Sequence, residues 1–273
     1  MKKICYIFAC AVLFVCSGMS RLGAVNFYDG VRAPDGLYLL NYFSWYRADE
    51  LVDNNGEAVS GHYGYTKTEG IFRLALYHSG LVVTALLPVG GVYVNSAGDG
   101  SFGIGDITAG AGFFLPIRWI DVLPMLFVKF PSGEFDADSA VNYGSGQYDL
   151  RPLVYVHKSI SRLTVDFAAK YHYRFENRDT GVRPGDEMHL QAVAGWLFFD
   201  AVRFGPSVSW MKAFNRELDG EEVSGTGRRV FSAGADLSFR ARSAGVTLTW
   251  LADAFARNST RGNYVQVKTV LRF

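Results

Sequence analysis

Cysteine is scarce in this sequence, and none occurs after the sixteenth residue. The three cysteines are Cys5, Cys10 and Cys16. Thiolate metal sites, thiol catalysis and a disulfide framework are therefore excluded from the rest of the chain. A cysteine-free chain is typical of proteins that cross an oxidising periplasm unfolded, because such a chain cannot form wrong disulfides there.

Long apolar segments and an excess of one charge are missing as well. After the first 24 residues no stretch reaches the about 18 uninterrupted apolar residues that a transmembrane helix needs. The chain has 27 Lys and Arg against 26 Asp and Glu, a net charge of +1. We therefore expect no nucleic-acid partner, because such partners are held by an excess of basic residues.

Sequence motifs of catalytic sites are also absent. The chain contains neither Gly-x-Ser-x-Gly nor His-Glu-x-x-His. Glycines at 103–105 and 110–112 are spaced like those of nucleotide-binding loops, but no βαβ pattern surrounds them. We therefore predict that the protein is not an enzyme and that it binds no cofactor.

The first 24 residues have the pattern of a cleaved secretory signal peptide. Met1-Lys2-Lys3 is basic, residues 4–15 are apolar, and small residues follow as far as Ala24. This apolar run is too short for a spanning helix. We expect cleavage after Ala24, with sites between residues 17 and 20 as alternatives, and a single domain over residues 25–273.

Alternation of apolar and polar residues dominates the remaining sequence. Near the C-terminus, Val265 and Val267 alternate with Gln266 and Lys268, and the sequence ends on Phe273. A β-strand places successive side chains on opposite faces, whereas helical spacing would mix the two sets. The alternating runs exceed the about five or six residues of a typical soluble strand. Their length matches that of a tilted strand that crosses a bilayer.

About twelve such strands are predicted, with connections that alternate between long and short. The even number is typical of an up-and-down barrel with both chain ends on the short-turn side. The expected strands are 36–48, 65–78, 81–89, 102–115, 122–130, 147–157, 162–175, 186–198, 203–214, 228–240, 246–256 and 264–273. The expected long connections are 49–64, 90–101, 131–146, 176–185, 215–227 and 257–263. The expected short ones are 78–81, 116–121, 158–161, 199–203 and 240–245.

A closed antiparallel transmembrane β-barrel satisfies both faces of these strands. In hydrocarbon every backbone polar group needs an internal partner, so a spanning sheet has to close on itself. The apolar face would meet lipid, and the polar face would line a narrow lumen. The lumen side chains expected to serve solute transport are Arg73, Asp106, Lys129, Arg151, Asp166, Lys170, His172, His189, Asp236, Arg240 and Lys268.

Two of these lumen residues are histidines on neighbouring predicted strands. His172 and His189 both lie near the long-loop end, so they could approach each other with Glu187 or Lys170 nearby. Such a group could act as a polar relay or bind a metal adventitiously. Ordinary polar residues of a lumen are the simpler interpretation, so we assign no metal site.

Four motifs together resemble one known family. They read Pro34-Asp35-Gly36-Leu37-Tyr38, Gly103-Ile104-Gly105-Asp106-Ile107, Pro131-Ser132-Gly133-Glu134-Phe135 and Tyr148-Asp149-Leu150-Arg151-Pro152. In order and spacing they resemble the transporter family of the meta-pathway of phenol degradation, over nearly all of residues 25–273. The family's common Pro-Thr-Gly-Asp-Tyr is Pro-Ser-Gly-Glu-Phe here, and Tyr148 stands where Trp is often found. The resemblance implies an outer-membrane barrel, but phenol itself is not carried over as the solute.

These patterns predict a bacterial outer-membrane channel or transporter. Small solutes, hydrophobic or aromatic, would pass by diffusion through a narrow polar lumen. One alternative is a barrel with a closed lumen and a structural or surface-interaction role, and a less favoured one is an outer-membrane hydrolase. The expected partners are outer-membrane lipid, small-molecule solutes, periplasmic chaperones and the barrel-assembly machinery. Phe273 resembles the terminal aromatic residue that this machinery recognises.

Overall fold

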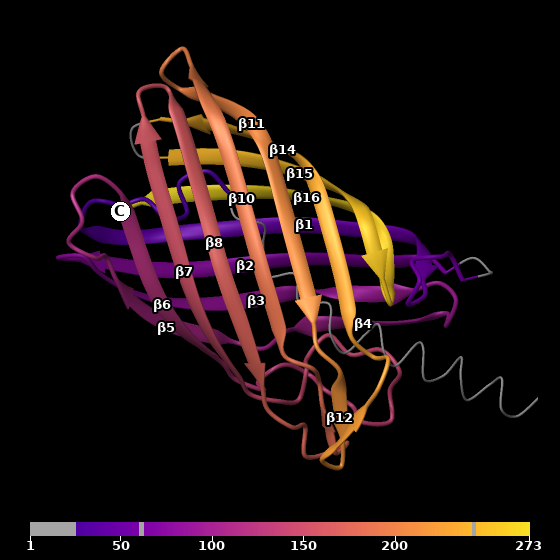
Figure 1. The fold of residues 1–273 in the computed structure, drawn as a ribbon. Helices are drawn as coiled ribbons and strands as arrows, with labels where there is room; N and C mark the ends of the chain where they lie inside the picture. Colours follow the sequence, from indigo (N-terminus) through magenta and orange to yellow (C-terminus); the bar gives the residue numbers. More distant parts are fainter. Residues whose placement is uncertain (1–25, 60–62, 242–243) are drawn as a thin grey trace, which may run out of the picture.

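The chain forms a closed antiparallel barrel of twelve strands (Figure 1). The computed structural model describes residues 26–59, 63–241 and 244–273, so the predicted signal peptide, residues 1–24, lies outside the described residues. The predicted fold class and strand number are confirmed. The barrel elements are β1 (Gly36–Val52), β2 (Tyr65–His78), β3 (Leu81–Val94), β4 (Asp99–Ile104), β5 (Thr108–Phe113), β6 (Asp121–Lys129), β7 (Asp149–Ile160), β8 (Leu163–Arg174), β10 (Glu187–Phe198), β11 (Val202–Ala213), β14 (Arg228–Arg240), β15 (Ala244–Arg257) and β16 (Ser259–Arg272).

The barrel closes between its first and last strands, as the alternating C-terminal sequence predicted. β1 pairs with β16 from Tyr38 opposite Arg272 to Val52 opposite Ser259. The other strands pair with their neighbours around the ring, and β2 with β3 completes it. Closure removes the edges of the sheet, which a hydrocarbon environment could not satisfy.

One barrel strand is interrupted, contrary to the prediction of a continuous strand over 102–115. β4 pairs with the second half of β3, and β5 pairs with its first half. Between them the Asp106 carboxylate accepts hydrogen bonds from the backbone N–H groups of Gly133 and Ser145, both at 3.0 Å. The break therefore lies where the wall of the barrel is tied to the connection between β6 and β7.

Two of the six connections predicted to be long are in fact short. The strands around them extend further than expected, so that only residues 95–98 connect β3 to β4 and only Asn258 connects β15 to β16. Gly98 and Asn258 have left-handed φ angles of 62° and 47°. Gly and Asn tolerate this conformation, which makes such tight turns possible.

The other connections are sorted by length as predicted. Within the long ones, β9 (Val182–Arg183), β12 (Arg216–Leu218) and β13 (Glu221–Val223) pair into a small second sheet. β12 lies beyond the end of the barrel opposite to the end marked C (Figure 1). The long connections and the small second sheet thus lie at one end of the barrel, together with the tight turns at 95–98 and Asn258, and the predicted short connections lie at the other.

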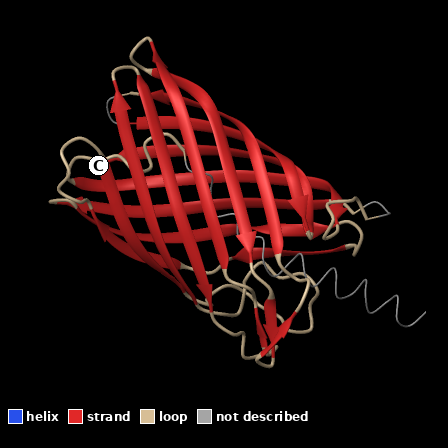
Figure 2. Cartoon of the chain, in the orientation of Figure 1, coloured by secondary structure: helices blue, strands red, loops and turns tan. Residues whose placement is uncertain are grey.

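The two faces of the barrel wall differ as the alternation predicted. Strands make up the whole wall (Figure 2). Large apolar side chains such as Phe43 and Phe72 are exposed on the outside, whereas charged side chains such as Asp149 and Glu187 are buried inside. Among the described residues, no helix is long and apolar enough to cross a membrane. The apolar outer face is the surface that lipid would cover.

Candidate functional site

The predicted lumen residues lie in the interior of the barrel. Arg240, at the end of β14, is exposed, but its guanidinium carbon lies 4.6 Å from the centre of the Tyr28 ring inside the barrel mouth. The ten others are buried side chains of the wall, namely Arg73, Asp106, Lys129, Arg151, Asp166, Lys170, His172, His189, Asp236 and Lys268. Phe273, the proposed assembly signal, is exposed.

One group of these side chains forms a chain of ion pairs beside the strand break. Lys129 Nζ lies 3.2 Å from Asp106 Oδ2 and 3.3 Å from Asp149 Oδ2. The same Asp149 oxygen accepts a hydrogen bond of 2.6 Å from Arg151 Nη2. Lys129 also contacts the Ser145 hydroxyl. Opposite charges on neighbouring strands thus compensate one another, as buried charges must.

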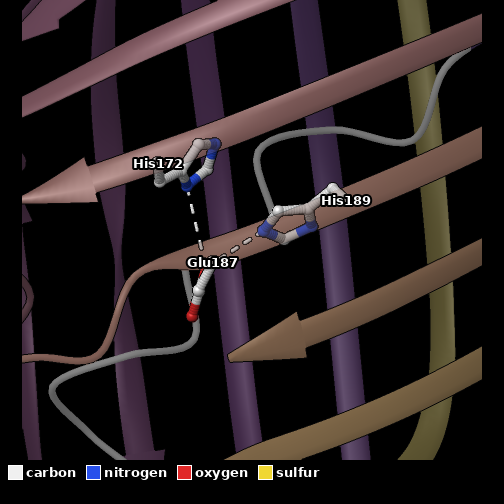
Figure 3. A group of neighbouring side chains, drawn as sticks. All are labelled: His172, Glu187 and His189. Atoms are coloured by element: carbon white, nitrogen blue, oxygen red, sulfur yellow. Dashed lines mark hydrogen bonds and ion pairs between the residues drawn. The ribbon is translucent and has the colours of Figure 1, made fainter. Parts of the chain in front are cut away.

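A second group surrounds Glu187 (Figure 3). One carboxylate oxygen lies 2.7 Å from Arg174 Nη2 and 2.9 Å from Arg228 Nη2. The other lies 3.0 Å from His189 Nε2 and 3.7 Å from His172 Nδ1. The two imidazole centres are 4.8 Å apart, so the predicted approach of the histidines is confirmed.

This second group contains donors of a type that binds Zn²⁺. Two imidazoles and one carboxylate lie within 4.8 Å of one another. However, Glu187 is also paired with two guanidinium groups. These give the group a net positive charge, which opposes a divalent cation. The geometry fits a polar relay that ties three strands together better than a metal centre.

The segment Asn26–Pro34 begins inside the barrel and ends at exposed positions, Arg32 and Pro34, at its rim, which the sequence interpretation did not foresee. Asn26 and Phe27 have no solvent exposure. Gln266 Nε2 donates a hydrogen bond of 3.0 Å to Asn26 Oδ1. Lys268 Nζ donates to the Phe27 carbonyl at 3.0 Å and to Asp29 Oδ1 at 2.7 Å. We call residues 26–34 the inner segment.

Aromatic contacts hold the inner segment in the lumen. The guanidinium carbons of Arg203 and Arg240 lie 4.9 Å and 4.6 Å from the centre of the Tyr28 ring. Such cation–π contacts are favourable when they are desolvated. A Cβ at Gly195 would lie 2.3 Å from the Phe27 ring, so only glycine leaves room there for this side chain.

The connection between β6 and β7 folds over the other end of the lumen. Tyr143 donates a hydrogen bond of 3.0 Å from its hydroxyl to Glu69 Oε1 on β2, and Lys67 Nζ lies 2.8 Å from the same oxygen. Burial, reinforced by the charge of Glu69, raises the pKa of the Tyr143 phenol. The phenol therefore stays protonated and keeps its hydrogen bond to Glu69 over the physiological pH range.

The inner segment contributes to the lining of two cavities inside the barrel. The smaller one is about 70 Å³, and Tyr42, Ile71, Phe127 and Tyr155 are among its lining residues. The larger is about 160 Å³, and Tyr38, Leu40, Tyr77 and Val270 are among its lining residues. Arg73 and Asp29 line both cavities. The lumen thus offers apolar and aromatic walls next to a small number of charges, which is typical of ligand sites.

The aromatic lining and the inner segment are the parts of the site that sequence reasoning missed. Tyr42 on β1 and Tyr155 on β7 belong to the inward-facing set of residues in their strands. The period-two rule could therefore have placed them among the lumen residues. The inner segment has no such signal, because its conformation is irregular and it is held by side chains that lie far away in the sequence, such as Gln266 and Asp166.

The sequence matches one family model, described as "Putative MetA-pathway of phenol degradation", over residues 48–269. The match includes three of the four motifs that carry the resemblance. No curated protein sequence matches the chain.

Three solved structures are among those similar to this chain. An outer membrane channel from Pseudomonas putida F1 is similar with a TM-score of 0.84 and 18% identity, over 91% of this chain and 100% of the channel. The NanC porin has a TM-score of 0.48 and 9% identity, over 86% of this chain and 100% of the porin. The CymD monoaromatic hydrocarbon channel has a TM-score of 0.45 and 10% identity, over 88% of this chain and 89% of that channel. The first of these shows that the fold is that of a bacterial outer-membrane barrel.

Proposed function

Because the chain belongs to the family of the MetA-pathway of phenol degradation, we propose that it is an outer-membrane channel for small hydrophobic or aromatic solutes. Solutes would pass by diffusion along the lumen, without an energy source. The observation that carries this proposal is the pair of adjoining cavities inside the barrel, with aromatic walls and Arg73 and Asp29 common to both. A barrel built only as a scaffold has no need to keep such space open.

The inner segment and the β6–β7 loop define what passage requires. Both are held by hydrogen bonds and ion pairs to the wall. A solute would therefore pass only when these contacts loosen, and we expect small and intermittent conductance. The alternative, a barrel with a permanently closed lumen and a structural or surface-interaction role, is favoured by the same contacts.

Reconstitution separates these two functions. The purified barrel would be inserted into planar bilayers for conductance and into liposomes for the uptake of neutral monoaromatic compounds. Channel function predicts discrete conductance steps and uptake faster than in liposomes that contain heat-denatured protein. A complete lack of both conductance and uptake would leave the closed-lumen alternative.

We further propose that the barrel is not a hydrolase and that residues 25–273 are the mature protein. The lack of a nucleophile motif supports the first point, and the pattern of residues 1–24 supports the second. Assays with lipid and ester substrates test the first. N-terminal sequencing of protein from the outer-membrane fraction tests the second. The proposed role of the terminal aromatic residue is tested by measuring the amount of folded barrel in the outer membrane. This amount is compared between cells depleted of the barrel-assembly machinery and cells that produce a Phe273→Ser variant.

A further inference from the structure

We propose that the lumen contains a binding site for small aromatic carboxylates, with the carboxylate on Arg73 and the ring against the aromatic walls of the adjoining cavities. This inference rests on the proposed channel function and names the chemical class of its solute. Its test is a binding measurement, so it can fail or succeed independently of transport.

Arg73 is a buried cation with neutral partners. Its side chain is 5% exposed. Its guanidinium donates to the Thr84 hydroxyl at 3.0 Å and to the Tyr42 hydroxyl at 3.4 Å. Among the described residues no carboxylate oxygen lies within 4.0 Å of it, which distinguishes it from Lys129, Arg151 and Lys268. A buried charge without a counterion is unfavourable, so an anion from outside would be bound there.

The surroundings of Arg73 add positive charge. Arg151 and Lys170 line the smaller cavity together with Arg73. The acid that lines both cavities, Asp29, is already paired with Lys268 at 2.7 Å. When the ion-pair partners are counted as well, Arg151 being paired with Asp149, four cations (Arg73, Arg151, Lys170 and Lys268) stand against two acids (Asp29 and Asp149) around the smaller cavity. This excess of positive charge favours an anionic ligand over a neutral or cationic one.

The walls next to Arg73 favour an aromatic group on that anion. Ile71, Phe127 and Tyr155 line the smaller cavity, and Tyr38 and Tyr77 line the larger. The larger cavity is about 160 Å³, and a cavity of about 150 Å³ is known to be large enough for benzene. A guanidinium can bind a carboxylate by two parallel hydrogen bonds, which would orient the ring away from Arg73 and toward these walls.

Binding of benzoate to the purified full-length barrel in detergent micelles tests the proposal. Isothermal titration calorimetry would compare benzoate with benzyl alcohol, which has the ring but no charge, and with acetate, which has the charge but no ring. We expect benzoate to bind at least about tenfold more tightly than either, because a charge-assisted hydrogen bond contributes about that factor. Equal affinities for benzoate and benzyl alcohol in the unmodified protein would overturn the proposal.

Substitution of Arg73 locates the site. Arg73→Gln is expected to weaken benzoate binding at least about tenfold and to leave benzyl alcohol unaffected. The matched control is Arg162→Gln, at an exposed arginine in the turn between β7 and β8, which should bind benzoate like the unmodified protein. Heat-modifiable gel mobility checks that each variant is folded. Unchanged benzoate affinity in folded Arg73→Gln would show that the carboxylate is not bound there.

The two proposals fail in different ways. Flux of neutral aromatic compounds without preferential binding of benzoate would leave the channel function standing and overturn the carboxylate site. Binding of benzoate that depends on Arg73, in a barrel with neither conductance nor uptake, would support the site and overturn the channel function.

Discussion

Glu187 is a residue on which four basic side chains converge. Arg174, Arg228, His172 and His189 all lie within 3.7 Å of its carboxylate, and they come from β8, β10 and β14. Glu187 itself is 1% exposed. A single carboxylate therefore compensates two guanidinium groups and fixes the orientation of two imidazoles, which makes this position sensitive to loss of its charge.

Glu187→Gln should destabilise the barrel by about 3–5 kcal/mol, because removing one partner of a buried ion pair leaves the other uncompensated. Urea unfolding in lipid vesicles measures this difference. The control is Glu221→Gln at an exposed carboxylate of β13, where a change within about 0.5 kcal/mol is expected. If the two variants unfold at the same urea concentration, the arginines are compensated by other groups.

For single residues, the sequence predicted which side chains face the lumen but not which side chains they contact there. Alternation placed Lys129, Arg151 and Asp166 inside the barrel. Which of them meet depends on the register between strands, and a shift of one residue would change every pair. The neutral surroundings of Arg73 could not be predicted for the same reason, because Thr84 lies on the next strand.

The alternation of faces is a property of whole strands. Val267 on β16 lies opposite Phe43 of β1 and Leu248 of β15, and the last two are exposed to the outside. Its neighbours Gln266 and Lys268 are buried in the lumen. The strand therefore separates lipid from lumen residue by residue, as the sequence predicted.

Val267→Arg should cost about 2–4 kcal/mol, because a cation on the lipid face near the midplane of a bilayer is poorly solvated. The unfolding free energy in vesicles measures this cost. Ser224→Arg, in an exposed loop, is the control and should change little. A small effect at Val267 would mean that this face does not contact lipid.

The inner segment is the element that most affects the open cross-section of the lumen. Tyr28→Ala removes the ring that Arg203 and Arg240 contact. We expect larger or more frequent conductance steps in planar bilayers, because the inner segment would leave its position more often. Asn54→Ala, at an exposed loop residue, is the control. Conductance equal to that of the unmodified protein would show that the inner segment does not limit passage.

The strands were predictable because each one repeats the same two-residue pattern. Two of the turns and the inner segment were not predictable in this way. The turns at 95–98 and Asn258 were predicted as longer loops, but the strands continue through polar and small residues such as Thr260 and Ser101. Tertiary pairing overrides weak local preferences. The inner segment was missed because irregular backbone leaves no periodic signal.

At the scale of the whole molecule, the barrel encloses part of its own chain. The inner segment interacts with Asp166 of β8, Asp236 of β14, and Gln266 and Lys268 of β16. These side chains belong to strands on different sides of the lumen. The inner segment therefore cross-links the interior of the ring in addition to the backbone pairing of the wall.

Deletion of residues 26–33 should lower the temperature at which the folded barrel converts to the unfolded form on a gel. Lys268 and Asp166 would lose partners inside a low-dielectric interior, which is unfavourable. The matched control is deletion of residues 216–223, which are equal in number and form the β12–β13 hairpin outside the barrel wall. A larger decrease for the control deletion would contradict a stabilising role of the inner segment.

The position of the inner segment has a consequence for the order of assembly. It directly precedes β1 in the chain, and β16, which pairs with β1, supplies Gln266 and Lys268 as its contacts. Once the seam between β1 and β16 has formed, residues 26–34 can reach these contacts only through an end of the barrel. Formation of the seam and capture of the inner segment are therefore coupled, because β16 binds both β1 and the segment that precedes it.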